Sequence, residues 1–444
     1  MARTNTRVNT KTVTHESGAG RSFRSDIELK RTAATCLLFE PTFYERGNDI
    51  ADRLASLASK VKFKDLADTA LWTRKGLNLR HVSLYLAVLA MQKDNGSKRA
   101  FVGDVIQRAD EMAEMIALYW KVNGKDAPLA GGLKKGIADA FGKFDEYQLG
   151  KWDSRNSAIR LRDVMFLTHP KPSKDREDLY NRIAEGKTLR ADTWEKRLSA
   201  GQDKGVAFSS LLAENKLGAM ALLRNLRNMV QSNVDRQLIL DALSKAKWDR
   251  VLPYRFASAV KHAPEFGDAL DKAFIKSAKA AKSPSGNGLI LVDVSGSMDW
   301  NMSEKSDIGR VEAAATLAAI AKESMDDTLV YAFENSLHGP YLGRGLKLVQ
   351  DIDATPRGGT RLGGALRELA SKHRGTKFDY LIVITDEQAH DSITSTPDAK
   401  TKVMVNVAPY KKGVAIGNDW LRVNGWSEKI LDFLKVDEDL LNEI

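Results

Sequence analysis

The chain has 444 residues, of which 43% are hydrophobic and 28% charged. These values exclude wholesale disorder, and the length favours two or more domains. The single cysteine permits no internal disulfide and suits a reducing compartment, while no apolar run approaches the roughly 18 residues of a membrane helix. The basic N-terminal stretch lacks the apolar core of a signal peptide. We therefore expect a soluble, cytoplasmic protein.

The positive charge is concentrated in the first two thirds of the chain. Residues 285–444 carry 18 Lys and Arg against 24 Asp and Glu, a net charge of −6, whereas residues 1–284 carry 50 against 34, a net charge of +16. A domain with such an excess attracts polyanions, and nucleic acid is the commonest of these. The alternative is a solvated helical surface that happens to be rich in Lys and Arg.

The N-terminal two thirds are predicted to be helical after a short tail. Residues 1–26 are basic and offer almost nothing to bury, so we predict a disordered tail. Between residues 27 and 284 the apolar residues recur at helical spacing. The clearest stretches are 84–91, 109–120, 161–167, 211–229 and 266–281. Stacked helical hairpins, as in an α-solenoid, fit this pattern, although no fixed repeat length is found.

The pattern changes at residues 283–288, Ser-Pro-Ser-Gly-Asn-Gly, and residues 285–444 alternate strand and helix. Predicted strands cover 289–294, 328–333, 380–385 and 402–407, and predicted helices cover 313–324, 362–372 and 428–435. Near-continuous Val, Ile and Leu in the strands indicate a parallel sheet buried on both faces. The predicted fold is an all-α helical-repeat domain followed by an α/β doubly wound domain, divided near residue 284.

One loop of the α/β domain gathers oxygen ligands. Asp293, Ser295 and Ser297 follow directly after its first strand, where the carboxyl ends of strands place ligand sites. Thr360, after two glycines, and Asp386, after the 380–385 strand, arrive from later strand ends. An all-oxygen set suits a hard cation such as Mg²⁺. The alternative is a Ser/Gly loop that caps a helix, with Asp386 simply ending a strand.

These five residues fill every position of the metal-ion-dependent adhesion site of von Willebrand factor A domains, which this region resembles. The resemblance implies a divalent metal ion, Mg²⁺, with one coordination position open to a carboxylate of a partner. Glu387, His390 and Asp391 lie nearby and could suggest acid–base chemistry. No nucleophile motif or phosphate-binding loop accompanies them, which argues against an enzyme.

Three segments of the helical region carry a second resemblance. Residues 35–47, 161–172 (L-R-D-V-M-F-L-T-H-P-K-P) and 221–226 (A-L-L-R-N-L) are similar to the TROVE domain of Ro autoantigen-type ribonucleoproteins. The similarity runs from about residue 28 to the C-terminus, and the length fits a bacterial or phage member. It implies a ring of HEAT-like repeats, closed by the A domain. Such proteins bind Y RNA, a small non-coding RNA, on an outer basic surface and single-stranded ends of misfolded RNA in a central hole.

The same resemblance assigns RNA-binding residues. His169 matches the RNA-contacting histidine of the family, and Lys151 and Arg155 match a basic pair upstream. The predicted patch is extended by Lys134, Lys135 and Lys171. A helix C-terminal histidine that bonds a last carbonyl is the alternative for His169, and surface solvation is the alternative for the lysines. Arg224 and Asn225 lie in the helical core motif, where structural and binding roles are both open.

The expected function is a non-catalytic RNA-binding scaffold in RNA quality control, with a divalent metal ion as cofactor. Expected partners are Y-like RNA, misfolded RNA and a protein such as an exoribonuclease, with no membrane, and the chain is expected to be a monomer. The alternative function is a metal-dependent protein-interaction module of the adhesion type, whose basic charge is incidental.

Overall fold

The computed structural model describes residues 24–35, 47–94, 96–153, 157–199, 201–281, 283–302, 308–407 and 419–424, with Val414, Ile430, Leu431 and Leu434. Two compact units are present. One comprises Ser25–Ala34 and Ala51–Ala246, and the other contains the chain from Lys247 onward. Across the described residues, every helix is too short or too polar to cross a membrane. The predicted tail lies almost wholly outside the described residues.

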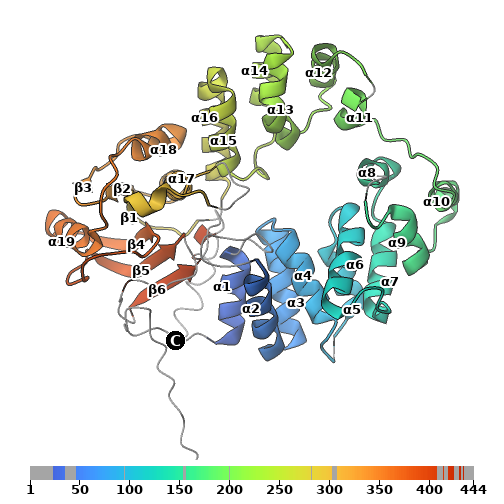
Figure 1. Ribbon diagram of the computed structural model, residues 1–444, viewed down its shortest axis with the longest axis horizontal. Helices are drawn as coiled ribbons and strands as arrows, with labels where there is room; N and C mark the ends of the chain where they lie inside the picture. The colour runs from blue at the N-terminus through green and yellow to red at the C-terminus, as the bar shows by residue number, and fades with distance from the viewer. Residues whose placement is uncertain are drawn as a thin grey trace, which may run out of the picture. The chain divides into compact units, whose positions relative to one another are not determined.

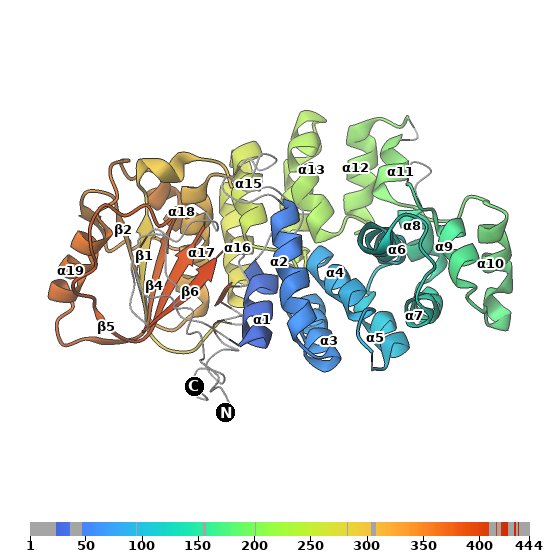
Figure 2. The same ribbon diagram turned by 60° about the horizontal axis from the view of Figure 1, so that its bottom comes forward.

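The described part of the first unit consists of helices (Figures 1 and 2). They are α1 (Ser25–Thr35), α2 (Gly47–Lys60), α3 (Phe63–Leu71), the π-helix η1 (Trp72–Gly76), α4 (His81–Ala90), α5 (Lys98–Val105), α6 (Asp110–Asn123), α7 (Gly131–Phe141), α8 (Glu146–Trp152), α9 (Leu161–Thr168), the 3₁₀ helix η2 (Lys174–Arg176), α10 (Glu177–Ala184), α11 (Trp194–Ser199), α12 (Lys204–Ala213), α13 (Ala219–Gln231) and α14 (Arg236–Lys245). The helical prediction for this region is therefore confirmed.

The predicted single helix over residues 211–229 is wrong, because the chain breaks there into α12 and α13. Asn215 adopts a left-handed backbone conformation (φ 53°). The N–H of Lys216 then bonds back to the carbonyl of Leu211 and satisfies an end group of α12. Apolar residues keep their helical spacing across this turn, so periodicity alone did not reveal it.

Close backbone approach positions α7 against α5. A Cβ at Gly136 would lie 2.5 Å from the Cβ of Val102 and 2.6 Å from the carbonyl oxygen of Arg99. Glycine is therefore the residue that allows these two helices to pack at this distance.

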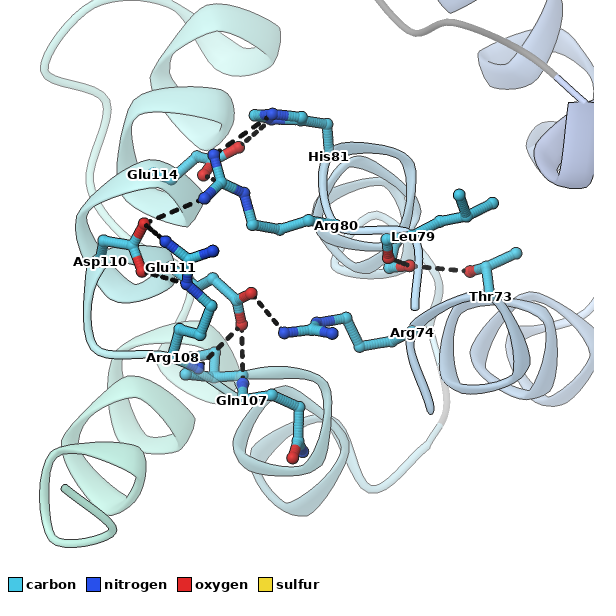
Figure 3. Close-up of polar contacts among 12 residues, drawn as sticks. Thr73, Arg74, Leu79, Arg80, His81, Gln107, Arg108, Asp110, Glu111 and Glu114 are labelled. Atoms are coloured by element: carbon cyan, nitrogen blue, oxygen red, sulfur yellow. Dashed lines mark hydrogen bonds and ion pairs between the residues drawn. The ribbon is translucent and has the colours of Figure 1, made fainter. Parts of the chain in front are cut away.

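A buried ion pair links η1 to α6 (Figure 3). The Arg74 guanidinium donates to Glu111 Oε1 at 2.5 Å, and the Glu111 side chain is fully buried. Glu111 Oε2 accepts the backbone N–H groups of Gln107 (2.7 Å) and Arg108 (3.1 Å) just before α6. One carboxylate thus binds two N–H groups of the segment that leads into α6 and neutralises a guanidinium from another helix.

A second layer of ion pairs joins α4 to α6 beside the first (Figure 3). Arg80 donates to Asp110 at 3.0 Å and lies 3.3 Å from Glu114, which also contacts His81. Arg108 forms a two-pronged pair with Asp110, at 3.0 and 2.8 Å. The order of these helices is therefore specified by polar contacts as well as by apolar packing.

The second unit holds a six-stranded sheet and its helices. Its elements are α15 (Tyr254–His262), η3 (Pro264–Phe266), α16 (Gly267–Lys279), β1 (Gly288–Asp293), η4 (Gly296–Asp299), α17 (Arg310–Ser324), β2 (Thr328–Phe333), β3 (Leu337–His338), α18 (Gly345–Asp353), α19 (Leu362–Lys372), β4 (Lys377–Thr385), β5 (Asp398–Asn406) and β6 (Trp420–Asn424). The strand order is β3-β2-β1-β4-β5-β6, and only the short β3 runs antiparallel to its neighbour. The α/β prediction is confirmed, while most of the predicted helix 428–435 lies outside the described residues.

Both faces of the sheet are covered. Leu289 and Leu291 of β1 share a buried core with Leu366 of α19. Side chains alternate along a strand, so Ile290 and Val292 lie on the opposite face, where α17 packs on β1 and β2. This double burial explains the unbroken apolar sequence of β1.

The helix α18 and the strands β3 and β6 were not anticipated from the sequence. The N-terminus of α18 is held by carboxylates of other helices, since Asp271 of α16 accepts the N–H of Leu346 at 2.6 Å. Glu323 of α17 accepts the N–H of Gly345 at 3.2 Å and pairs with Arg344 at 2.9 Å. Contacts from distant segments stabilise α18, and a local sequence pattern does not contain them.

Two helices that precede residue 284 pack with the sheet unit. Both α15 and α16 contact α17, and Lys261 pairs with Glu312 at 2.5 Å. The change of pattern at residues 283–288 therefore marks the start of the sheet, whereas the compact unit begins near Lys247. The predicted domain limits, 27–284 and 285–444, stay a prediction.

We predict that Glu111→Ala lowers the free energy of unfolding by about 3–5 kcal/mol, because it leaves the Arg74 guanidinium buried without a carboxylate. Urea unfolding followed by circular dichroism measures the change. The control is Asp68→Ala, which removes an exposed pair with Lys64 and should cost less than about 1 kcal/mol. Equal costs for the two variants would contradict the role given to the buried pair.

Candidate metal centre and nucleic-acid interface

The predicted metal ligands lie where the strand order reverses. β1 pairs with β2 on one side and β4 on the other, so the carboxyl ends of β1 and β4 are neighbours at a topological switch point. Asp293 is the last residue of β1, and Asp386 follows the last residue of β4. The parallel sheet therefore brings together two carboxylates that are far apart in the sequence.

Asp293 is fully buried and held by two hydrogen bonds. The N–H of Ser295 donates to Asp293 Oδ1 at 2.9 Å, and the Thr385 hydroxyl donates to Oδ2 at 2.6 Å. The hydroxyls of Ser295 and Ser297 lie 3.2 Å apart. Burial and the nearby Asp386 carboxylate raise the pKa of Asp293 to about 7.

The most direct structural support for a bound cation comes from the Asp386 carboxylate. Its Oδ2 atom is buried and accepts no hydrogen bond within the described part of the chain. The guanidinium of Arg310, also buried, lies 3.6 Å from this oxygen. Burial raises the pKa of Asp386, while a hydrogen bond from Ser297 and the charge of Arg310 oppose the rise.

Thr360 is buried in a loop that is bonded to the serine loop. The N–H of Gly296 donates to the carbonyl of Gly358 at 2.9 Å, two residues before Thr360. A Cβ at Gly358 would lie 2.0 Å from Glu334 Oε2, so a larger residue here would displace the Glu334 carboxylate. The structure thus brings together the loops that carry all five predicted ligands.

The donor set fits a hard cation. It offers two carboxylates and three hydroxyls, and the Asp386 Oδ2 atom, which faces Arg310, accepts no hydrogen bond from a described residue. Nowhere in the described chain, this site included, do three His, Cys, Asp or Glu side chains converge as a metal cluster. Arg310 already supplies part of the neutralising charge. Metal binding stays a prediction.

The acidic residues after β4 are used by the fold. Glu387 is buried and accepts from Asn406 at 3.1 Å and from Arg422 at 3.0 Å. Asp391 accepts the N–H groups of Gly363 and Gly364 at the start of α19, at 2.9 and 2.7 Å. These contacts give both carboxylates structural roles.

The basic residues of the helical unit fall into two groups. One group forms ion pairs between helices: Arg99 pairs with Asp139 at 2.5 Å and Arg182 with Glu146 at 2.6 Å. Lys143 donates to the carbonyls of Gly103 and Ile106 at the end of α5. The other group has no ion pair with a described residue, and it includes Lys134, Lys135, Lys151, Arg162, His169 and Lys171.

His169 caps α9 through its backbone and leaves its side chain exposed. It adopts a left-handed conformation (φ 51°), and its N–H bonds to the carbonyl of Met165 at 2.8 Å. The alternative interpretation from sequence, a helix-terminal histidine, therefore holds for the backbone. The imidazole ring is exposed and forms no hydrogen bond with a described residue, so it remains available to a ligand.

Lys151 lies at the end of α8, beside an exposed tryptophan. Its Nζ is 5.2 Å from the ring centre of Trp152, and the Arg108 guanidinium lies 4.0 Å from that ring. Arg155 lies outside the described residues. In α13, Arg224 is exposed, whereas Asn225 is buried and donates to the carbonyl of Ala221 at 2.9 Å. Asn225 therefore has a structural role.

Sequence reasoning missed Arg108, Trp152 and Arg310 as parts of these two sites. Arg108 and Trp152 are far apart in the chain. Arg310 stands just before the predicted helix 313–324. A tryptophan at the end of an amphipathic helix carries no local signal of exposure, so only the packed structure reveals the pairing with Arg108.

Comparison with known proteins supports the fold and one part of the helical region. Residues 176–282 match the TROVE domain family. The crystal structure of the Deinococcus radiodurans Ro (Rsr) protein superposes with a TM-score of 0.62 at 18% identity, covering 93% of this chain and 100% of that one. Rat (Rattus norvegicus) telomerase protein component 1 is 22% identical over 305 aligned residues, which cover 48% of this chain and 11% of that protein.

The predictions of a TROVE domain and of a Ro-like fold are therefore confirmed. The chain spans about a tenth of the telomerase component, so that protein's assembly says little about this one. Residues 134–171, which carry the candidate RNA-binding side chains, precede the matched segment. Their assignment rests on the geometry above.

We predict that Glu387→Ala lowers the free energy of unfolding by about 3–5 kcal/mol, because it removes a carboxylate from the buried Arg422. Equilibrium urea unfolding of the full chain provides the measurement. His390→Ala, at an exposed neighbouring position, should leave stability unchanged within about 0.5 kcal/mol. A stable Glu387→Ala protein would reopen a chemical role for this residue.

Proposed function

We propose that this chain, which carries a TROVE domain in a Ro-like fold, is an RNA-binding scaffold without catalytic activity. It binds a structured, Y-like small RNA on the surface of α7–α9 and receives single-stranded ends of misfolded RNA at a separate place, in a central hole. Its A-type domain holds a divalent metal ion, such as Mg²⁺, that assists docking of a protein partner.

The group of unpaired cations on α7–α9 carries the RNA part of the proposal. Many basic residues form ion pairs between helices, and such paired residues contribute no attraction for phosphate. Lys134, Lys135, Lys151, His169 and Lys171 escape this use and are at least partly exposed. Phosphate contacts from such side chains dominate nucleic-acid affinity and make it depend on salt.

The Oδ2 atom of Asp386 supports the metal part. A divalent ion bound there would leave a coordination position for an incoming carboxylate, so a bound partner would complete the shell. The same observation favours the second candidate function, a metal-dependent protein-interaction module with incidental basic charge. Salt dependence of RNA binding separates the two, because a module of that kind shows no steep loss of RNA affinity with salt.

The absence of catalysis is proposed from the use of the polar groups. The carboxylates beside the site, Glu387 and Asp391, are bound to an arginine and to a helix N-terminus. Hydrolysis or group transfer needs a nucleophile beside a base. Neither carboxylate belongs to such a pair among the described residues.

We predict that the double variant Lys151→Ala/Lys171→Ala, and His169→Ser, bind a structured stem–loop RNA more weakly than the wild type does. Each lost phosphate contact should reduce the slope of log affinity against log salt by about one. Fluorescence anisotropy at several salt concentrations measures both quantities.

The control for this experiment is Lys64→Ala, since Lys64 is exposed but paired with Asp68 on α3. It should bind RNA as the wild type does. Binding of a single-stranded RNA end should fall less than binding of the stem–loop in the Lys151, Lys171 and His169 variants. Equal losses for both RNAs would contradict separate binding places.

We predict that Asp293→Ala abolishes Mg²⁺ or Mn²⁺ binding in isothermal titration, because it removes one of two carboxylates from the site. RNA affinity in a gel shift should not change, since every charge of the helical unit is retained. Unchanged metal affinity in this variant would rule out the site. Metal-dependent cleavage of RNA by the wild type would overturn the non-catalytic proposal.

A further inference from the structure

We propose that Phe166, on the exposed face of α9, stacks on an unpaired base of the bound RNA. This inference rests on the proposed RNA binding and names the part of the RNA that this surface recognises. It assigns a binding role to an uncharged residue, which a search for basic residues does not detect.

The first observation is the exposed stripe of α9. Leu161, Val164, Met165 and Thr168 are the buried residues of this helix. Arg162 and Phe166 lie four residues apart, and at about 100° per residue they fall within about 40° of one another. Phe166 is 52% exposed, so half of a large apolar side chain faces water.

The second observation is that α8 and α9 carry most of the exposed aromatic residues of the described chain. Seven large hydrophobic side chains are exposed in the described chain, and three of them, Tyr147, Trp152 and Phe166, belong to α8 and α9. All three are aromatic, in a chain with only 7% aromatic residues. Scattered exposure of single apolar residues is ordinary, but a gathering of aromatic rings points to a binding surface.

The ends of α8 and α9 are fixed to each other. Asp153 accepts the N–H of Leu161 at 3.1 Å and lies 3.7 Å from Arg160. Trp152, the last residue of α8, is therefore near the first turn of α9 (Figure 2). The aromatic rings and the unpaired cations share one region of the helical unit.

The charges around Phe166 favour nucleic acid over an apolar protein partner. The Arg162 guanidinium lies 5.4 Å from the Phe166 ring centre and has no ion pair with a described residue. The carboxylates of this region are occupied, since Asp163 accepts the N–H of Arg160 at 2.8 Å and Glu146 pairs with Arg182. Cations beside an aromatic face match a phosphate beside a base.

Stacking requires a base that is not paired. In an A-form duplex the bases are stacked on each other and their faces are covered, whereas a loop or bulge can present one face to a side chain. Phe166 should therefore contribute to binding of a stem–loop RNA with unpaired loop nucleotides and not to binding of a blunt duplex.

The test measures the affinity of the full chain for two fluorescein-labelled RNAs, a stem–loop with an eight-nucleotide loop and a blunt duplex of equal charge. Phe166→Ala should bind the stem–loop about 5- to 150-fold more weakly. Phe166→Leu should be similarly weak, Phe166→Trp should retain wild-type affinity, and blunt-duplex affinity should not change. The salt slope should stay at its wild-type value, because no charge is removed.

The matched control is Val206→Ala, which trims an equally exposed apolar side chain (58%) on α12. It should bind both RNAs as the wild type does. Wild-type affinity for the stem–loop in Phe166→Ala and Phe166→Leu would overturn the stacking role while leaving RNA binding intact. A wild-type chain that binds neither RNA, or binds without salt dependence, would instead overturn the proposed function.

Discussion

The use of carboxylates at helix N-termini is the interaction on which much of this structure depends. Short helices leave many backbone N–H groups without partners, and acidic side chains accept several of these bonds. Asp145 does so for α8, Asp203 for α12, Asp235 for α14 and Asp391 for α19. Because these acids are occupied, part of the basic charge of the helical unit is left without a partner. The same device that orders the helices therefore leaves positive charge on the surface.

The α/β unit solves a different electrostatic problem. Parallel strands place Asp293 and Asp386 together at one end of the sheet, and burial raises the pKa of both carboxyl groups. Hydrogen bonds from Thr385 and the N–H of Ser295 hold Asp293, while Arg310 faces Asp386. Two buried acids with one nearby guanidinium leave room for one more positive charge, and a divalent ion is the proposed source.

The sequence was sufficient for the parts of the fold that local patterns encode. The strand over 328–333 and the helix over 362–372 were predicted with their observed limits, since unbroken apolar runs and glycine-flanked helices are local signals. The limits of α12 and α13 were not, because a left-handed Asn215 interrupts a pattern that continues in register. Nor was α18, whose first N–H groups depend on Asp271 and Glu323 from other helices.

The two candidate sites differ in how much of each could be predicted from the sequence. A run such as Asp293-Val-Ser295-Gly-Ser297 has fixed spacing, so its oxygens were found by reading alone, and the structure adds Arg310 to them. The RNA surface has no such spacing. Whether a basic residue is paired, as Arg99 of α5 is with Asp139 of α7, or unpaired, as Lys151 is, depends on which residues fold against it. The exposure of Phe166 follows from packing in the same way.

The attachment of α15 and α16 to the sheet decides where this chain can be divided into fragments. A fragment that starts at residue 285 would follow the change in amino-acid pattern, but it would separate Glu312 from Lys261 and the start of α18 from Asp271. The side chains of α17 that pack against α16 would then face water and favour aggregation. A fragment that starts near Lys247 keeps these contacts and is the natural choice for producing the α/β unit by itself.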